Sequence, residues 1–499
     1  MNTGDIADTR GGADDGVRSS GYVPELNRTL GPFQVFAVSF AFISVVVAVF
    51  ATYGSVLQNS GPVGIWLWVV AAVGQTLVAL VVAQFAARIA LSGSSYQWAS
   101  RLANPKVGWF FGWLTFWYLA IAVVAMDNAL ASQALMPLVG LVPDEDVARL
   151  ITLAVMLVQA VLVIASTRLL GMISSSAVGV ELAILAVLVI GLGVVMILSG
   201  TGTVGNLTSR GVTADASNYF AVGGGFLFAI IMGLTTLVGF DSAANLAEEA
   251  KDPFRSVPRA IVASVITSAA LGFLFVIILT MAIRDVDAVT NSGSPVAAII
   301  REQLGPVMER ILLAAIAFAM FGAGMVIMAA GSRQVFAMAR DERFPGYKVL
   351  RRVNPRTKTP ILATILILAV GVVLMVALPG SALLQLIIAS STLPALIYGA
   401  VTVLYLSVRK RLERKEGSFS LGRFEVPVTV AAIVWVVIAL FALVSPGTSL
   451  VPDWIVIGLI LTGALYFAKM LIFNRDVLDH EPGEDSVTAS TPEGSTHGT

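Results

Sequence analysis

Hydrophobic residues occur in long runs along most of the chain, and short polar segments separate these runs. A helix needs about 20 mostly apolar residues to cross a bilayer. The runs that reach or approach this length, numbered here as spans 1 to 12, are 33–55, 64–88, 109–137, 149–167, 175–199, 220–246, 260–283, 310–333, 360–379, 382–407, 426–445 and 453–473. The pattern predicts an all-α polytopic membrane protein with about twelve transmembrane helices.

Composition supports a membrane location. Hydrophobic residues make up 57% of the 499 residues and charged residues only 12%, whereas about 25% is usual in soluble domains. Mean hydropathy is +0.87. So few charges cannot cover the surface of a soluble protein of this length, and the bilayer is the solvent that fits. The formal net charge is zero, so bulk charge indicates no nucleic-acid partner.

Cofactor chemistry lacks its usual ligands. The chain has no cysteine, which excludes disulfides, thiolate zinc sites and iron–sulfur clusters. Its two histidines, His480 and His497, lie in the polar C-terminal segment. We expect no cofactor, no metal and no enzymatic activity, because a membrane enzyme would depend on isolated acidic residues.

The ends of the chain differ from its centre. Residues 1–31 are polar and rich in Gly and Asp, without the apolar core of a signal peptide, and residues 475–499 are similar. Both are predicted to be disordered tails around a transporter domain at 32–474. Within it we expect two repeats, at about 32–199 and 220–407, and two further helices at about 426–473.

Lys and Arg residues indicate the orientation. If the spans alternate in direction, about 26 of the 31 basic residues fall on the side of the two tails. This predicts a multi-pass protein of the plasma membrane with both termini in the cytoplasm. The most basic loops, 332–360 and 409–424, carry either this topological signal or sites for lipid or partner binding. No connecting loop predicts a soluble domain or an obligatory protein partner, although the outer loop 284–309 predicts a short surface helix.

Three acidic residues lie within predicted spans, and each is a functional candidate because an ionisable group at membrane depth is costly. Asp127 is in the middle of span 3 and either pairs with a cationic substrate or anchors a neighbouring helix. Glu181 is near the start of span 5. It is either a snorkelling or capping carboxylate close to the interface, or a proton carrier or cation ligand. Asp241 follows Thr235, Thr236 and Gly239 in span 6.

The span 6 pattern predicts a locally unwound helix, and a kink packed against a neighbouring helix is the alternative. Small residues beside hydroxyls and an acid suit a segment whose freed backbone groups need partners. Ser39 and Ser44 interrupt span 1, which holds the equivalent place in the first repeat. Broken helices at equivalent places in inverted repeats are typical of a binding site in the middle of the membrane.

Four stretches resemble one family. "GFDSAANLAEEAKDPFRSVPRAI" (239–261) is similar to the sixth-span signature of the amino acid–polyamine–organocation superfamily, and within it to the amino acid/choline permeases, which include GABA and choline carriers. "SGSSYQWASRLANPKVGWFFGWLTFW" (92–117), "SRQVFAMARDERFPG" (332–346) and "FSLGRFEVPV" (419–428) resemble further segments of that family in the same order.

This resemblance implies a leucine-transporter-type fold, with two inverted five-helix repeats plus two C-terminal helices. It implies a substrate between broken spans 1 and 6, with spans 3, 8 and 10 around it. The first break would fall at Phe42, Ile43, Ser44 and Val45, and the second at Thr235 to Gly239 with Asp241 beyond. Glu181 falls where some relatives carry a lysine or histidine that is thought to replace a sodium ion or carry a proton.

The chain also departs from the family pattern. Relatives usually have glycine where Ser44 stands, with small residues in place of Val45 and Val46, and this bulk narrows access to backbone N–H groups. Gln84 and Ala90 replace an acid and a proline. Together with Asp127, these changes favour amines or amino acids whose cationic end dominates recognition.

Charged residues after span 6 predict an inner gate. Glu248 and Glu249 precede the basic residues Lys251, Arg255 and Arg259, and these charges could pair with facing loops when the cytoplasmic side is closed. A plain positive-inside loop is the alternative.

We therefore expect a secondary active transporter that imports a small amino acid or amine by alternating access. No nucleotide-binding motif is present, so an ion must drive uptake. Protons are favoured over sodium because Glu181 is titratable. A solute exchanger and a sodium-coupled amine or choline carrier are the alternatives, and a channel or membrane sensor is a more distant one.

Overall fold

The computed structural model describes residues 17–18, 20–141, 144–292, 294–377, 383–412, 419–444 and 451–480. Within these ranges every regular element is a helix, apart from one isolated bridge between Leu30 and Ala250. Residues 1–16 and 481–499 of the predicted tails lie outside the described part of the chain.

Each predicted span corresponds to helical structure. In the described part of the chain, ten helices are long and apolar enough to cross a membrane, and two shorter apolar helices, at Gly225–Thr236 and Ile361–Val376, accompany them. The elements of the spans in chain order are α2 (Pro32–Ile43) and α3 (Val45–Ser60), η1 (Pro62–Trp66) and α4 (Leu67–Ala86), α6 (Pro105–Ala129), η2 (Leu130–Leu135) and α7 (Met136–Leu138), α8 (Glu145–Ala165), α9 (Thr167–Ser199), α10 (Gly225–Phe228), α11 (Ile230–Thr236) and α12 (Ser242–Asn245), α13 (Pro253–Met281), α16 (Pro306–Arg340), α18 (Ile361–Ala377), α19 (Leu383–Val408), α20 (Glu425–Val444) and α21 (Val451–Phe473).

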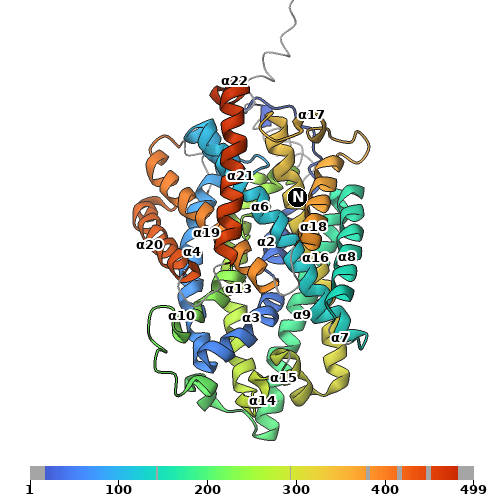
Figure 1. Cartoon of the computed structure of the whole chain (residues 1–499), viewed down its shortest axis with the longest axis vertical. Helices are drawn as coiled ribbons and strands as arrows, with labels where there is room; N and C mark the ends of the chain where they lie inside the picture. The colour runs from blue at the N-terminus through green and yellow to red at the C-terminus, as the bar shows by residue number, and fades with distance from the viewer. Residues whose placement is uncertain are drawn as a thin grey trace, which may run out of the picture.

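Short helices lie at the ends of the bundle. They are α5 (Ser95–Leu102), η3 (Val204–Thr208), η4 (Gly211–Thr213), η5 (Ala247–Glu249), α14 (Val286–Thr290), α15 (Pro295–Leu304), α17 (Tyr347–Leu350), η7 (Gly422–Phe424) and α22 (Arg475–Asp479). In Figure 1, α14 and α15 lie at one end of the bundle, and α17 and α22 lie at the other. Helix α15 matches the short helix predicted for the loop 284–309.

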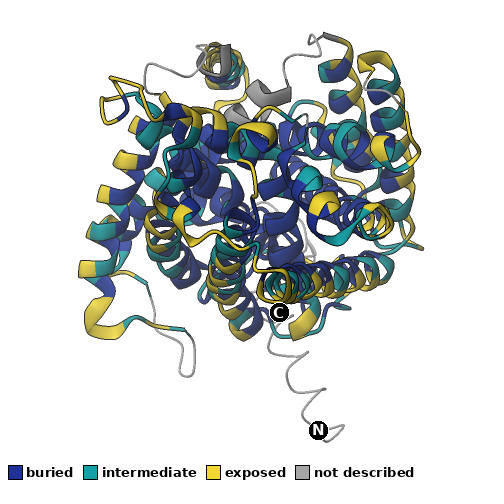
Figure 2. Ribbon diagram, turned by 90° about the horizontal axis from the view of Figure 1, so that it is seen from below, coloured by how far each residue is buried: buried dark blue, intermediate teal, exposed yellow. Residues whose placement is uncertain are grey.

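The spans form a bundle with an apolar outer surface. Figure 2 shows buried residues gathered at the centre and exposed residues on the outward faces of the surrounding helices. Many of the exposed side chains are large and hydrophobic, as Ile197 and Leu198 at the end of α9 illustrate. Such a surface is costly in water and suits contact with lipid.

The two predicted helix breaks are present. Helix α2 ends at Ile43, and α3 begins at Val45 after Ser44, whose φ of 39° is in the left-handed region. Helix α11 ends at Thr236, and α12 begins only at Ser242. Between them Gly239 has a φ of 76°, and a Cβ atom there would lie 1.9 Å from the Phe42 ring. Glycine is therefore required where the two breaks meet.

Several helices are longer than the sequence indicated. Helix α9 begins at Thr167, so Glu181 lies about four turns inside it and not near its start. The first turns of α9 were not predicted as part of span 5, because Ser174 and Ser175 lower the hydropathy of this segment. Both serine hydroxyls nevertheless donate to the Gly171 carbonyl inside the helix. Glu181 therefore does not lie at the start of its helix, but its interpretation as a capping carboxylate stays open, because its Oε1 accepts from the Val46 N–H at the start of α3. Helix α16 extends to Arg340, which is likewise beyond the predicted end at 333.

Parts of both predicted tails pack against the bundle. Tyr22, Leu26 and Leu30 are buried, and so is Leu478 in α22. The backbone around Leu30 pairs with residues 249–251 through the Leu30 N–H to the Glu249 carbonyl and the Lys251 N–H to the Leu30 carbonyl. Scattered apolar residues in these polar segments anchor them, and composition alone did not reveal this.

Candidate substrate site and cytoplasmic gate

A cavity of about 80 Å³ lies beside the two breaks. Helices α3 and α6 provide most of its wall, and the last residues of α2 and α11 complete much of the rest. Its lining comprises Phe42, Ile43, Val47, Ala48, Ala51, Thr52, Tyr118, Ala122, Ala125, Met126, Ala129, Thr235, Thr236, Val238, Ile327 and Ser390. Four of the predicted substrate-binding residues, Phe42, Ile43, Thr235 and Thr236, are therefore brought together.

The polar side chains in this lining are hydroxyls, and none is a carboxylate, lysine or arginine. Thr235 and Thr236 donate their hydroxyl hydrogens to carbonyls of the preceding turn of α11, so their oxygens are left to accept. The buried Tyr118 hydroxyl has no hydrogen-bond partner among the described residues. A ligand in the cavity can satisfy this hydroxyl, so Tyr118 is a candidate binding residue that sequence analysis missed.

Tyr398 of α19 holds the span 6 break in shape. Its hydroxyl accepts a hydrogen bond from the Gly239 N–H at 3.1 Å and donates to Asp241 Oδ1 at 2.8 Å. Ser94 Oγ donates to Asp241 Oδ2 at 3.3 Å, and the Phe240 ring stacks on Tyr398. Gly239 and Asp241 thus lie outside the cavity lining and organise the unwound backbone next to it.

Ser39 connects the two broken spans. Its hydroxyl donates to the Phe240 carbonyl at 2.7 Å and accepts from the Ala243 N–H at 3.4 Å. Freed peptide groups inside a membrane need such partners. The serine that interrupts span 1 is therefore a ligand for the backbone of span 6.

Glu181 reaches the break in span 1 from α9. Its Oε1 accepts hydrogen bonds from the Val46 N–H at 3.2 Å and from the Ser44 hydroxyl at 3.4 Å. A carboxylate at the first turn of α3 is favoured by the free N–H groups and the positive end of the helix dipole. Ser44 and Val45 do not line the cavity. The N–H group of Val46 at the start of α3 is bound by the Glu181 carboxylate.

Asp127 faces away from the cavity. It is fully buried, its Oδ1 accepts from Gln159 Nε2 of α8 at 2.8 Å, and its Oδ2 has no partner among the described residues. Gly324 of α16 leaves the necessary room, since a Cβ there would lie 2.3 Å from Asp127 Oδ1. Its neighbours Ala125 and Met126 line the cavity, but Asp127 does not. The role of Asp127 in substrate binding stays a prediction, and it is not supported by a place in the cavity lining.

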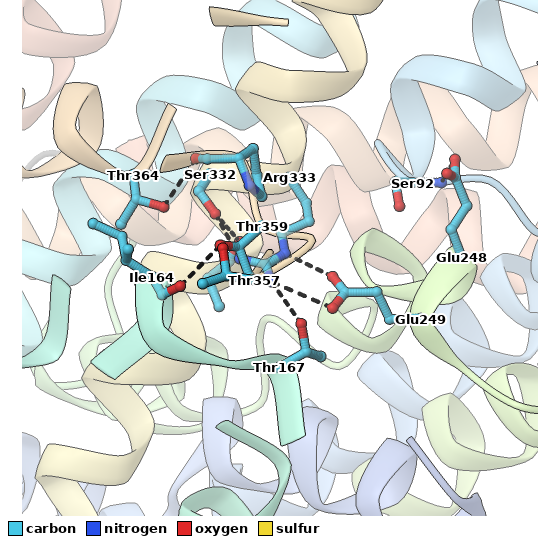
Figure 3. A network of polar contacts seen from close by, with 12 residues as sticks. Ser92, Ile164, Thr167, Glu248, Glu249, Ser332, Arg333, Thr357, Thr359 and Thr364 are labelled. Atoms are coloured by element: carbon cyan, nitrogen blue, oxygen red, sulfur yellow. Dashed lines mark hydrogen bonds and ion pairs between the residues drawn. The ribbon is translucent and has the colours of Figure 1, made fainter. Parts of the chain in front are cut away.

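The two glutamates of the predicted gate form ion pairs with α16. Glu249 Oε1 lies 2.7 Å from Arg333 Nε, and both side chains have 0% exposure. Figure 3 shows this pair in a wider network, in which Arg333 also reaches Ser332 and Thr167. Glu248 accepts from Arg340 at 2.9 Å and from the Ser92 N–H at 3.0 Å.

A second polar layer covers these pairs. The Tyr22 hydroxyl donates to Asp341 Oδ1 at 2.6 Å, and the Arg340 guanidinium lies 3.7 Å from the centre of the Tyr22 ring. Burial, together with the Asp341 carboxylate, raises the pKa of Tyr22 well above its usual range. Tyr96 donates to the other Asp341 oxygen at 2.6 Å. The end of the bundle that carries α17 and α22 is therefore closed between α16, α5 and the N-terminal segment.

The basic residues of the predicted gate do not pair with the two glutamates. Lys251 and Arg255 are exposed, and no ion pair is recorded for either among the described residues. Arg333 and Arg340 supply the positive charges in their place. Both occur in the stretch 332–346, which is part of the predicted basic loop 332–360. Their spacing of seven residues places them on one face of a helix. This spacing, together with the adjacent pair Glu248 and Glu249, is the sequence signal that could have predicted the two ion pairs.

In the described part of the chain, no group of three or more His, Cys, Asp or Glu side chains is placed to hold a metal ion. What the fold and cavity define is a polytopic membrane protein with a small cavity beside two interrupted helices, whose mostly apolar lining includes five hydroxyl-bearing side chains. This arrangement is typical of secondary transporters.

The comparison with protein families is specific. The sequence profile of the family "Amino acid permease" matches residues 30–467, so the chain belongs to the amino acid permease family, whose members move amino acids across membranes. It is 26% identical to the amino-acid permease BAT1 of Arabidopsis thaliana, over 84% of this chain and 86% of that protein. It is 28% identical to the GABA-specific permease of Saccharomyces cerevisiae, over 82% of this chain and 74% of that protein. The superfamily resemblance found in the motifs is thereby confirmed.

Proposed function

We propose that the protein is a secondary active transporter that imports a small amino acid or amine across the plasma membrane by alternating access. The observation that carries this proposal is the cavity at the point where two broken helices meet, since a mid-membrane cavity of this kind holds a solute away from both aqueous phases. The predicted repeats, at about 32–199 and 220–407, would be the two halves that move around it.

The cavity favours a small zwitterion. About 80 Å³ is well below the roughly 300–1,000 Å³ of pockets for drug-sized ligands. With no carboxylate in the lining, a cationic substrate lacks a charged partner there, whereas backbone groups of the breaks and the hydroxyls of Tyr118 and Thr236 can bind both ends of an amino acid. This moves our proposal from amines toward small amino acids, and the name of the yeast relative makes GABA one candidate.

Proton coupling is the proposed energy source. Glu181 is buried and binds the Val46 N–H at the start of α3, so a change in its protonation would change how firmly the break in span 1 is held. A neutral carboxyl makes weaker hydrogen bonds to N–H donors than a carboxylate does. This contact supports a link between proton binding and the geometry of the cavity.

Two steps test the transport proposal with purified protein. A thermal-shift screen against amino acids, GABA, choline, ethanolamine and polyamines identifies the ligand, because a ligand that binds the folded state raises the melting temperature. Counterflow of that ligand in proteoliposomes then tests the mechanism. We expect trans-acceleration, and downhill flux without trans-acceleration would indicate a channel.

The variant Glu181→Gln tests the coupling. It should abolish proton-driven concentrative uptake and spare exchange, because glutamine keeps a hydrogen-bond acceptor near Val46 but cannot take up or release a proton. Uptake driven by a pH gradient and counterflow without a gradient are the two measurements. Glu302→Gln, which removes a half-exposed carboxylate outside the bundle core, is the control. Equal loss of uptake and exchange in Glu181→Gln would count against a coupling role.

A further inference from the structure

A second concave surface lies on the outside of the bundle, between α19 and the segment formed by α5 and α6. It is an open groove with a volume of about 560 Å³. One wall is a single face of α19 and the turn after it, with Gly399, Val403, Ser407 and Arg411 at intervals of four residues. The substrate cavity shares none of its lining.

The groove changes character along its length. The opposite wall consists of Leu102, Val107 and Phe111 with their neighbours, so this wall is apolar. Ser407 lies in the last turn of α19, and Arg411 lies just beyond the end of that helix. From Gly399 to Val408, where α19 ends, the rise along the helix is about 14 Å, which is close to the hydrocarbon thickness of one leaflet, about half of 30 Å.

Arg411 is available for a ligand. It is exposed, and no ion pair is recorded for it among the described residues, whereas the nearby Arg409 pairs with Glu425 at 3.5 Å. A guanidinium group binds phosphate oxygens in a bidentate manner. The basic end of the bundle is also the end that faces the more anionic leaflet if the basic loops are cytoplasmic.

We propose that this groove, defined by Gly399, Val403, Ser407 and Arg411 on one side and by Leu102, Val107 and Phe111 on the other, binds one anionic phospholipid. An acyl chain lies along the apolar walls, the ester region is next to the Ser407 hydroxyl, and the phosphate contacts Arg411. Charge selects an anionic headgroup, and the walls select a chain of one-leaflet length.

The position of the groove relates the lipid to the substrate site. Gly399 follows Tyr398, whose hydroxyl holds both Gly239 and Asp241 at the span 6 break. A chain packed against Gly399 and Val403 restrains the same part of α19 that carries this tyrosine. Lipid binding itself requires neither the transport proposal nor the coupling role of Glu181, so the experiment below measures binding alone.

The test uses the full-length protein in detergent, titrated with dioleoylphosphatidylglycerol or with dioleoylphosphatidylcholine. We measure the melting temperature, and we count bound lipids by native mass spectrometry. We expect one retained phosphatidylglycerol and a larger thermal shift than with phosphatidylcholine. Arg411→Gln should remove the difference between the two lipids, and Val403→Trp, which fills the groove, should remove the retained lipid.

Matched variants provide the controls. Lys410→Gln removes an adjacent exposed charge that does not line the groove, and Val437→Trp adds the same bulk to an exposed position on α20 outside it. Both should behave as the unmodified protein does. Equal lipid responses in all variants, or a retained lipid that persists in Val403→Trp, would overturn the proposal in favour of a non-specific lipid layer. Loss of retention in Val403→Trp with no headgroup preference in the unmodified protein would also contradict it.

Discussion

At the scale of single residues, the cavity depends on side chains that keep an unused hydrogen-bonding capacity. Tyr118 is the clearest case, because this residue lines the cavity and its buried hydroxyl has no partner among the described residues. A buried polar group without a partner costs free energy. Its retention is understandable if a substrate supplies the missing hydrogen bond.

Tyr118→Phe should therefore weaken substrate binding without weakening the fold. Loss of one hydrogen bond of about 0.5–1.5 kcal/mol corresponds to a roughly twofold to tenfold rise in Kd, and the ligand-free melting temperature should stay the same or rise. Tyr53→Phe is the control, since that hydroxyl bonds Thr280 at 2.7 Å and does not line the cavity. It should lower the melting temperature and leave Kd unchanged. The reverse pattern would exclude Tyr118 from the site.

Asp127→Asn separates the two roles considered for that residue. Asparagine keeps an oxygen that can accept from Gln159, and Asp127 does not line the cavity. We expect the affinities for neutral and cationic substrates to change by the same small factor. A selective loss of cationic substrates, measured by competition in counterflow, would instead restore Asp127 as a direct binding residue.

At the scale of elements, close helix contact depends on glycines that no hydropathy pattern reveals. Helix α16 approaches α6 at Gly324, where a Cβ atom would lie 2.3 Å from Asp127 Oδ1 and 2.5 Å from Gln159 Nε2. Neither neighbour can move away easily, because the two side chains are hydrogen-bonded to each other. Small residues at such positions allow membrane helices to pack closely.

Gly324→Ala should lower stability by about 1–3 kcal/mol, the usual cost of overpacking. Gly179→Ala in α9 is the matched control, because nothing lies within 4 Å of its added Cβ. At that exposed helical position alanine should be neutral or stabilising by about 0.5–1 kcal/mol. Melting temperatures in one detergent provide the comparison. Equal effects of the two substitutions would show that the α6–α16 contact is looser than the structure indicates.

At the scale of the whole molecule, buried and partly buried ion pairs connect two segments at one end of the bundle. Glu248 and Glu249 follow the broken span 6, and Arg333 and Arg340 end the long helix α16. Removing one member of a buried ion pair costs about 3–5 kcal/mol, because the other charge is left unpaired. If the pair is present in only one of two conformations, a cost of this size changes their population ratio by roughly 100-fold to 5,000-fold.

Glu249→Gln should therefore open this end of the bundle. The chain has no cysteine, so Ala243→Cys, at a buried position of α12, reports opening through labelling by a membrane-impermeant maleimide. We expect labelling at least tenfold faster with Glu249→Gln.

Two further variants control for this result. The double variant Glu249→Gln/Arg333→Gln, in which no charge is left unpaired, should be more stable than either single variant. Arg351→Gln breaks a largely exposed pair with Glu342 and should leave labelling unchanged, since exposed pairs contribute little. Unchanged labelling in Glu249→Gln would show that the pair does not act as a gate.

The sequence determined the class of protein, the number and order of the spans, and the two breaks. These features follow from local properties: run length against bilayer thickness, and small or hydroxylated residues such as Ser44 and Gly239 where a helix unwinds. The family motifs were local as well, and they led to the right superfamily.

Only the tertiary structure decided which side chains face one another. Helix α9 brings Glu181 to the start of α3, Tyr398 comes from α19 to the span 6 break, and Arg333 comes from α16 to Glu249. These partners are more than 80 residues apart in the chain, so no local pattern connects them. A span shows its hydrophobicity in its sequence, but the direction of each polar side chain depends on the neighbouring helices against which it packs.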